Sequence, residues 1–137
     1  MPRSIPGRDP KPDHIIWAGG LVDVSKDAAQ LALGTKQLGS LPIGALVIGV
    51  QTQCEVALSG GTPALKFGTT VATGTELVAN AAYAATAIST IAAPNTIAGF
   101  IAPLTVETPI YAKETGAATA GKVRLNVLYR MANPPGS

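Results

Sequence analysis

Charged side chains are scarce in this sequence, and the shortage indicates how the surface is used. Only 13% of the 137 residues are Asp, Glu, Lys or Arg, about half the share of an average soluble domain. Monomers rarely expose large apolar patches, and a weakly charged surface favours association. We therefore expect the protein to assemble with other chains. The alternative is a low-charge β-protein that stays monomeric.

Aromatic residues are also few, at 4% of the chain, which is too little for a platform on which nucleic-acid bases stack. The formal net charge is +2, and the Lys and Arg residues are scattered. They form no run that could follow a phosphate backbone. We expect no direct binding of nucleic acid.

Residue types that often act in catalysis or metal binding do not cluster in this sequence. His14 is the single histidine and has no G-x-S-x-G nucleophile motif beside it. Cys54 is the single cysteine, which excludes an internal disulfide and is typical of a small buried residue. Asp23 and Asp27 could bind a cation in a loop, but two carboxylates four residues apart are common by chance. We expect no catalytic residue, no cofactor and no metal site.

No charged residue occurs between Leu77 and Val106. The stretch is rich in alanine and is interrupted by Pro94, Gly99 and Pro103. A membrane-spanning helix needs about 20 strongly apolar residues. The N-terminus also lacks the apolar run of a signal peptide. We expect no membrane contact, and we expect this stretch to be buried in the core or in an interface.

Four prolines punctuate residues 1 to 14, which excludes a central strand or a helix there. The segment is expected to be an extended arm. It is either a disordered tail or an arm that lies across a neighbouring subunit. The residues predicted to contact subunits or a capsid are Arg3, Ile5, Arg8, Lys11 and Trp17.

The clearest predicted strand covers residues 45 to 58. Its even positions, from Leu46 to Leu58, form one predicted face. The second half alternates between apolar and polar residues, as in a strand with one buried face. The first half is apolar at odd and even positions alike, so we expect it to be covered on both sides. Gly49 predicts a bulge or a close approach of another segment.

Two β-hairpins are predicted. The first joins this strand to residues 63 to 68 through a turn that contains Gly-Gly. The second joins alternating strands at residues 104 to 113 and 122 to 131 through a glycine-containing loop. Pro109 has no backbone donor, so it is expected at an edge or a bulge.

Two segments have weak patterns. Residues 74 to 92 predict a short helix or a loop, followed by an edge strand. Residues 25 to 35 predict a loop or a short strand. Short strands separated by Gly- and Pro-rich turns favour an all-β fold, an antiparallel β-sandwich resembling a jelly roll, with at most one short helix. The predicted domain spans residues 15 to 131, between the arm and a tail at 132 to 137.

Two stretches resemble small virion proteins of tailed bacteriophages. The first is LGSLPIGALVIGV, residues 38 to 50, and the second is GAATAGKVRLNVLY, residues 116 to 129. The resemblance extends over residues 36 to 130, although residues 68 to 100 depart from any recognisable pattern. Its motifs are structural and carry no catalytic residues.

The resemblance implies a capsid decoration, or cement, protein. Such a protein is a β-sandwich that sits on the capsid surface as a trimer or another small homo-oligomer and bridges subunits of the major capsid protein. It would be made in the host cytoplasm and end in the virion. The alternatives are a tail, connector or fibre-attachment virion protein, or a host-surface or carbohydrate-binding β-sandwich module.

Overall fold

The computed structural model describes residues 15–71, 74–96, 100 and 102–131. The predicted arm and tail lie outside these residues. The described elements are β1 (Ile16–Asp23), α1 (Val24–Leu33), β2 (Lys36–Leu41), β3 (Ala45–Ser59), β4 (Ala64–Gly68), β5 (Val78–Ala81), β6 (Ala87–Ile88), β7 (Thr108–Thr115) and β8 (Ala120–Met131). None of the described helices is long and apolar enough to cross a membrane.

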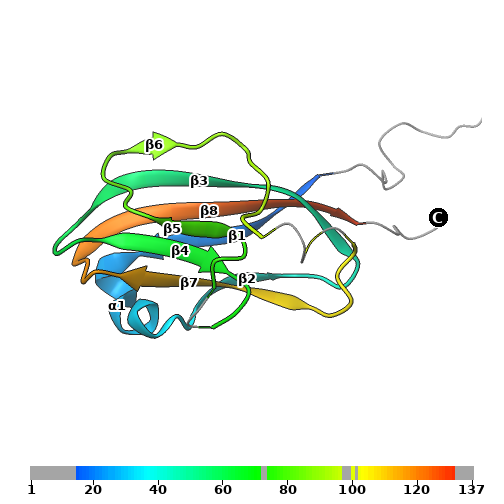
Figure 1. The fold of residues 1–137 in the computed structure, drawn as a ribbon, viewed down its shortest axis with the longest axis horizontal. Coiled ribbons are helices and arrows are strands. Elements are labelled where there is room, and N and C mark those ends of the chain that lie inside the picture. Colours follow the sequence, from blue (N-terminus) through cyan, green and yellow to red (C-terminus); the bar gives the residue numbers. More distant parts are fainter. Residues whose placement is uncertain (1–14, 72–73, 97–99, 101, 132–137) are drawn as a thin grey trace, which may run out of the picture.

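The strands form two antiparallel four-stranded sheets that pack as a sandwich (Figure 1). Sheet A has the order β1-β8-β3-β6 and sheet B the order β2-β7-β4-β5. The hydrogen-bonded pairs are thus nested, since β1 pairs with β8, β2 with β7, β3 with β6 and β4 with β5. This nesting is the topology of a jelly roll. The predicted all-β sandwich with one short helix is confirmed.

Both predicted hairpins are wrong in their pairing, although their strands exist. β3 belongs to sheet A and β4 to sheet B, and β7 and β8 are divided in the same way. Each turn therefore carries the chain from one layer to the other. The two crossing loops bind each other, because the Thr62 N–H donates to the Gly116 carbonyl at 2.9 Å. The alternation of apolar and polar residues predicts that a strand has one buried face. It does not predict which of the two sheets the strand joins, so the pairing could not be read from it.

β3 shows how a bulge changes which face is buried. The register slips between Val47 and Gly49, so Ile48 and Gly49 both oppose Leu128 of β8. Val50 then points inward and is buried, whereas Ile48 remains exposed on the outer face. The single face predicted from the even positions is therefore wrong, while the bulge predicted at Gly49 is confirmed. A Cβ added at Gly49 would lie 2.7 Å from Ile91 Cγ2, which confirms the predicted close approach.

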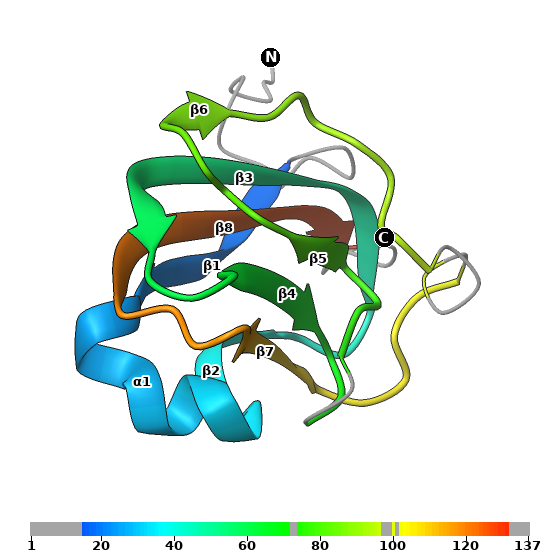
Figure 2. The ribbon, with the colours of Figure 1, turned by 60° about the vertical axis from the view of Figure 1, so that its left-hand side comes forward.

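The one α-helix of the described residues lies where a loop or short strand was predicted. α1 begins after Asp23, whose carboxylate accepts from the Ser25 N–H at 3.2 Å, and ends at Gly34 in the left-handed conformation. This N-cap and glycine C-cap stop the helix at both ends. Leu31 is fully buried, and α1 lies beside β1, β2 and β7, away from β6 (Figure 2).

Residues 74 to 92 hold two edge strands, β5 and β6, and no helix among those described. The helix alternative for this stretch is wrong, because its residues form hydrogen-bonded pairs with neighbouring strands. Leu65 of β4 pairs with Ala81, and Cys54 of β3 pairs with Ala87. The alanines favour a helix only locally, and tertiary pairing overrides this preference.

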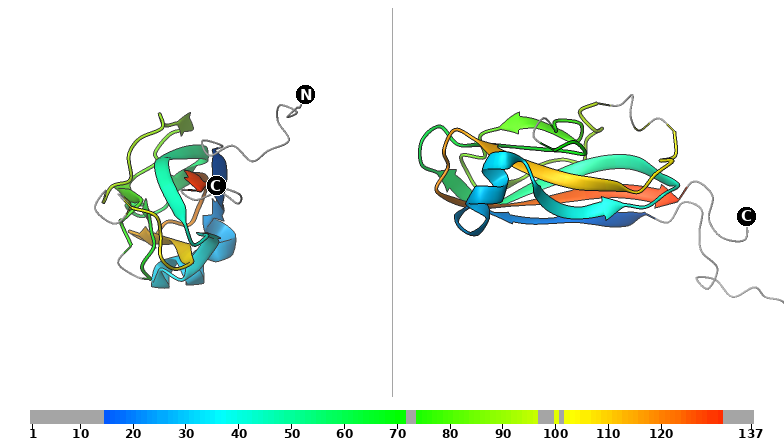
Figure 3. Two further views of the ribbon diagram at one scale, coloured as in Figure 1. Left: turned by 90° about the vertical axis from the view of Figure 1, so that its right-hand side faces the viewer. Right: turned by 90° about the horizontal axis from the view of Figure 1, so that it is seen from below.

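The core lies between the two layers, which the end view separates (Figure 3). Its largest fully buried side chains are Phe67, Leu31, Leu41, Leu65, Leu77, Ile110 and Leu125. Pro109 pairs with Ser40 of β2, and the β4 partners of β7 end at Tyr111. Pro109 therefore occupies an edge-like position within β7, as its missing donor predicted.

Candidate functional site

The isolated acidic residues have structural roles. Asp23 caps α1, and its hydrogen bonds from the Ser25 side chain and backbone lower the pKa of its carboxyl group. Asp27 forms an ion pair with Lys36 at 3.3 Å. Across the described part of the chain, no three His, Cys, Asp or Glu side chains gather closely enough to hold a metal ion. His14 lies outside the described residues.

Cys54 is buried, as its sequence context predicted. Burial raises the pKa of its thiol. Its Sγ atom lies 3.5 Å from the Val56 carbonyl oxygen and 3.7 Å from that of Tyr83. A protonated thiol that faces carbonyl groups is a poor nucleophile, so Cys54 acts as a small core residue.

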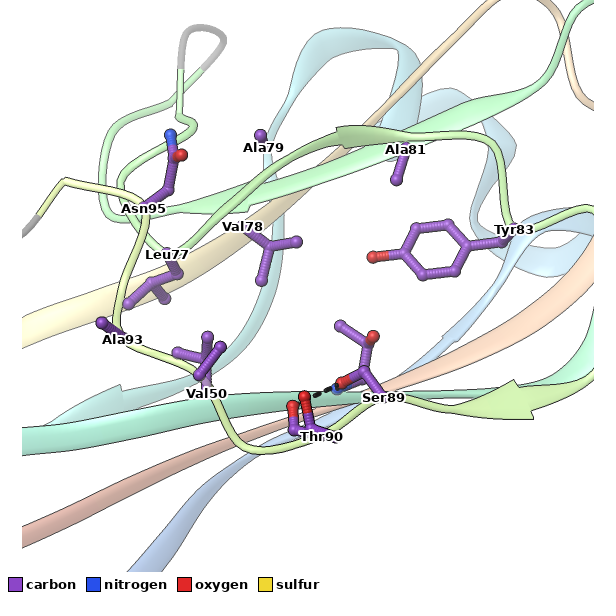
Figure 4. Close-up of a pocket in the computed structure, with 12 residues that line it drawn as sticks. Val50, Leu77, Val78, Ala79, Ala81, Tyr83, Ser89, Thr90, Ala93 and Asn95 are labelled. Atoms are coloured by element: carbon purple, nitrogen blue, oxygen red, sulfur yellow. Dashed lines mark hydrogen bonds between the residues drawn. The ribbon is translucent and has the colours of Figure 1, made fainter.

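A groove of about 360 Å³ opens between the edges formed by β5 and β6. Apolar side chains line most of it, including Val50, Val78 and Ala81 (Figure 4). The Tyr83 ring packs edge-on against Phe67, with ring centroids 6.5 Å apart, and its hydroxyl points into the groove. Burial raises the pKa of Tyr83, so the hydroxyl stays neutral. The groove can bind an apolar segment but holds no acid–base pair.

Glu76 fixes one wall of this groove. Its carboxylate accepts from the Thr69 N–H at 2.9 Å and from the Thr70 hydroxyl at 2.7 Å. Its carbonyl accepts from the Thr96 N–H at 2.9 Å. Burial works against the charged form, but these hydrogen bonds outweigh it and lower the pKa of Glu76. The carboxylate thus holds the chain after β4, and the backbone carbonyl of Glu76 joins it to the segment after β6.

The substitution Glu76→Gln weakens the hydrogen bonds that the carboxylate accepts, so it is expected to lower the free energy of unfolding at pH 7. The loss should be only about 1 kcal/mol, because solvent screens a partly buried carboxylate. A lowered folded pKa stabilises the protein above the unfolded pKa of about 4.3, and the contribution is lost as the pH falls through the folded pKa. The difference between wild type and variant should therefore vanish in acid. Urea unfolding across this pH range checks it, with Glu107→Gln as an exposed control. A difference that does not change with pH would contradict it.

The outer face of sheet A carries an exposed apolar patch at one end. We define the outer patch as Trp17, Ile48, Ile91 and Leu128. Leu128 is only 4% exposed, although it lies outside the core between the sheets. Trp17 pairs directly across from it on β1, and the β3 bulge places Ile48 on its other side. Trp17 is 51% exposed and Ile48 is 42% exposed.

The structure places one of the five predicted contact residues, Trp17, on this patch. The others, Arg3, Ile5, Arg8 and Lys11, lie outside the described residues. Sequence reasoning missed Ile48, Ile91 and Leu128 as surface residues. The signal was present in β3, whose first half is apolar on both faces. The chain itself covers only the inner of these two faces.

The outer face of sheet B differs in character. Lys66 of β4 lies directly opposite Lys113 of β7. Neither lysine takes part in the ion pairs of the described residues, which join Lys36 to Asp27 and Arg124 to Glu55. Like charges in such a position repel each other. This face therefore carries two adjacent lysines, whereas the outer patch is apolar.

Three solved structures have the same fold. One is a chain in the acid-stable capsid of Helicobacter pylori bacteriophage KHP30, with a TM-score of 0.61 and 17% identity over 87% of this chain and 89% of that one. A chain in the capsid of Ralstonia phage GP4 gives a TM-score of 0.59 and 18% identity over 96% and 93%. A chain in the capsid asymmetric unit of cyanophage Pam1 gives 0.53 and 19% over 95% and 97%. No model of a known protein family matches the sequence, and neither does any curated protein.

Proposed function

We propose that this protein is a non-enzymatic structural component of a bacteriophage capsid. The observation that carries the proposal is the similarity of nearly the whole jelly roll to chains from three phage capsids, with TM-scores from 0.53 to 0.61. The proposal also agrees with the phage-like stretches of the sequence. The buried thiol and the acids engaged in caps and ion pairs offer no assembled catalytic site.

Within the capsid, the proposed role is decoration. The protein binds the assembled shell and bridges subunits of the major capsid protein. A ligand that binds the assembled state and not the free subunits stabilises it by mass action. Two features support this role, namely the 13% content of charged residues and the exposed apolar side chains on sheet A.

The proposal includes self-association as a trimer and contacts made by the N-terminal segment. Arg3, Ile5, Arg8 and Lys11 precede β1, which begins at Ile16 beside the outer patch. An extended segment attached there can reach about 40 Å, at roughly 3.1 Å per residue. That reach is enough to cross onto a neighbouring chain.

The decisive experiment adds purified protein to heads assembled without it, from the phage that encodes the chain. We expect saturable binding of many copies per head and a higher temperature of head disruption. Binding of a handful of copies at one vertex would favour a tail or connector protein instead. No binding at any concentration would contradict a role in the capsid shell.

The same assay tests the arm and the oligomer. A chain that lacks residues 1 to 14 is expected to bind heads more weakly, and unchanged binding would refute the contact role of the arm. Sedimentation of the full chain is expected to show a trimer at micromolar concentration. A clean monomer would refute self-association in solution.

A further inference from the structure

The outer patch is unusual because its centre is already formed without a partner. Leu128 lies on the solvent side of sheet A, yet its neighbours leave it only 4% exposed. Its cross-strand neighbours are Trp17 of β1 and, at the bulge, Ile48 and Gly49 of β3. Because Gly49 has no side chain, Ile91 can lie against it. A Cβ at this position would collide with Ile91 Cγ2. Four apolar side chains from four segments thus form one ordered surface.

This surface lies at one end of sheet A, and the exposed apolar side chains nearer the other end, Val56 and Ile88, stand apart from it beside polar partners. Toward the other end, the same face carries Asn126, Gln51 and the ion pair between Arg124 and Glu55. Farther along, Lys122 lies opposite Asp23. Only at the patch do several large apolar side chains gather around a buried one. A contiguous exposed apolar surface of this kind marks a place where a partner excludes water.

One charged group belongs to the patch. Arg130 follows Leu128 on the same face of β8, and it lies opposite Leu46 of β3. Neither ion pair of the described residues includes it. The described side chains of the patch offer no carboxylate to Arg130. A guanidinium beside exposed Trp and Ile side chains is the composition typical of interface hot spots.

The position of Arg130 also indicates the kind of occupant. In a two-fold contact between copies, a residue near the symmetry axis meets its own counterpart. A contact whose axis passes near Arg130 would bring two Arg130 side chains together on a surface that offers no carboxylate. Like charges brought together in this way cost several kcal/mol. The patch therefore requires a complementary surface that combines an apolar hollow with at least one carboxylate.

We propose that the outer patch is the face that docks on a capsid subunit, with Trp17 as its apolar anchor and Arg130 pairing with a carboxylate of that subunit. This inference rests on the proposed function and adds which face meets the shell. It assigns the opposite face, with Lys66 and Lys113, to the solvent side of the particle.

The test measures binding of full-length variants to heads that lack the protein. Trp17→Ser is expected to raise the half-saturating concentration by about 30-fold or more, as for a central aromatic hot spot. Arg130→Glu is expected to raise it by about 10-fold or more, because it sets two carboxylates against each other. Leu33→Ser, on a side chain that is 66% exposed on α1, and Lys26→Glu, a charge reversal on α1, are the matched controls. Both controls should stay within about two-fold of wild type.

The outcomes separate the two proposals. If wild type saturates the heads and both patch variants bind equally well, the docking face is wrong and the capsid role stands. If wild type does not bind, the capsid role fails, and this inference fails with it. If the patch variants instead break up a homo-oligomer, the patch joins copies of this chain, which also overturns the inference. Thermal unfolding confirms that each variant is folded, and Ile48→Ser replaces Trp17→Ser if the latter is not.

Discussion

Truncation of the Phe67 side chain, Phe67→Ala, is expected to lower the free energy of unfolding by about 3–5 kcal/mol. Phe67 is fully buried in β4, between the two sheets. It lies opposite Ala112 of β7 and Val78 of β5, so its cross-strand partners are smaller than the ring they flank. Its ring also supports Tyr83 through an edge-on contact worth about 0.5–1.5 kcal/mol beyond burial.

Equilibrium unfolding in guanidinium chloride, followed by circular dichroism, measures this loss. Phe67→Leu keeps most of the volume and should cost less than half as much, while Val106→Ala, at a side chain that is 64% exposed, should stay within about 0.5 kcal/mol of wild type. A loss below about 1 kcal/mol for Phe67→Ala would contradict the described core. Because Tyr83 lines the groove, the variant should also loosen the wall between β5 and β6.

The sequence predicted the strands better than their partners. Apolar and polar residues alternate in the second half of β3 and along β7 and β8, and each of these is a strand. Pairing is not encoded in alternation, because a buried face fits either layer of a sandwich. Gly60-Gly61 and the loop after Thr115 are typical of hairpin turns, yet each carries the chain across to the other sheet. Nested pairing follows from the whole chain, and no local signal reports it.

Helix α1 was missed for a different reason. Its caps, Asp23 and Gly34, are visible in the sequence, but only two buried residues, Val24 and Leu31, on a ten-residue helix give a weak periodic signal. Residues 74 to 92 had the opposite problem, since their alanines favour a helix that strand pairing overrides. In both cases the local preference was small compared with tertiary packing.

The candidate docking face could be predicted in part. Trp17 was identified as a contact residue because it is the single tryptophan beside the proline-rich segment. The first half of β3 was predicted to be covered on both sides, and the chain covers only its inner side. The bulge that turns Ile48 outward shifts the register by one residue, and the sequence marks its place only by Gly49. Without that shift, the outer patch could not be assembled from the alternation.

Two glycines at the edge formed by β1 and β2 allow a sharper test of the fold. Gly19 and Gly39 have nearly the same φ, +128° and +130°. A Cβ at Gly39 has space, since its nearest neighbour is the Gly19 carbonyl oxygen at 3.7 Å. A Cβ at Gly19 would instead collide with the Leu125 carbonyl oxygen of β8. A side chain at either position therefore carries the cost of a positive φ, and only one at Gly19 also collides with β8.

Gly39→Ala is expected to cost about 1–3 kcal/mol, the usual range for a side chain forced into a rarely populated conformation. Gly19→Ala is expected to cost at least about 2 kcal/mol more, because β1 must move away from β8 to admit the methyl group. Chemical denaturation of both variants measures the difference, and equal losses would contradict the close approach of the strands. Since Trp17 lies two residues before Gly19 and opposite Leu128, a displaced β1 should also disrupt the outer patch. Gly19→Ala should then weaken binding to heads even where it remains folded, whereas Gly39→Ala should leave binding unchanged.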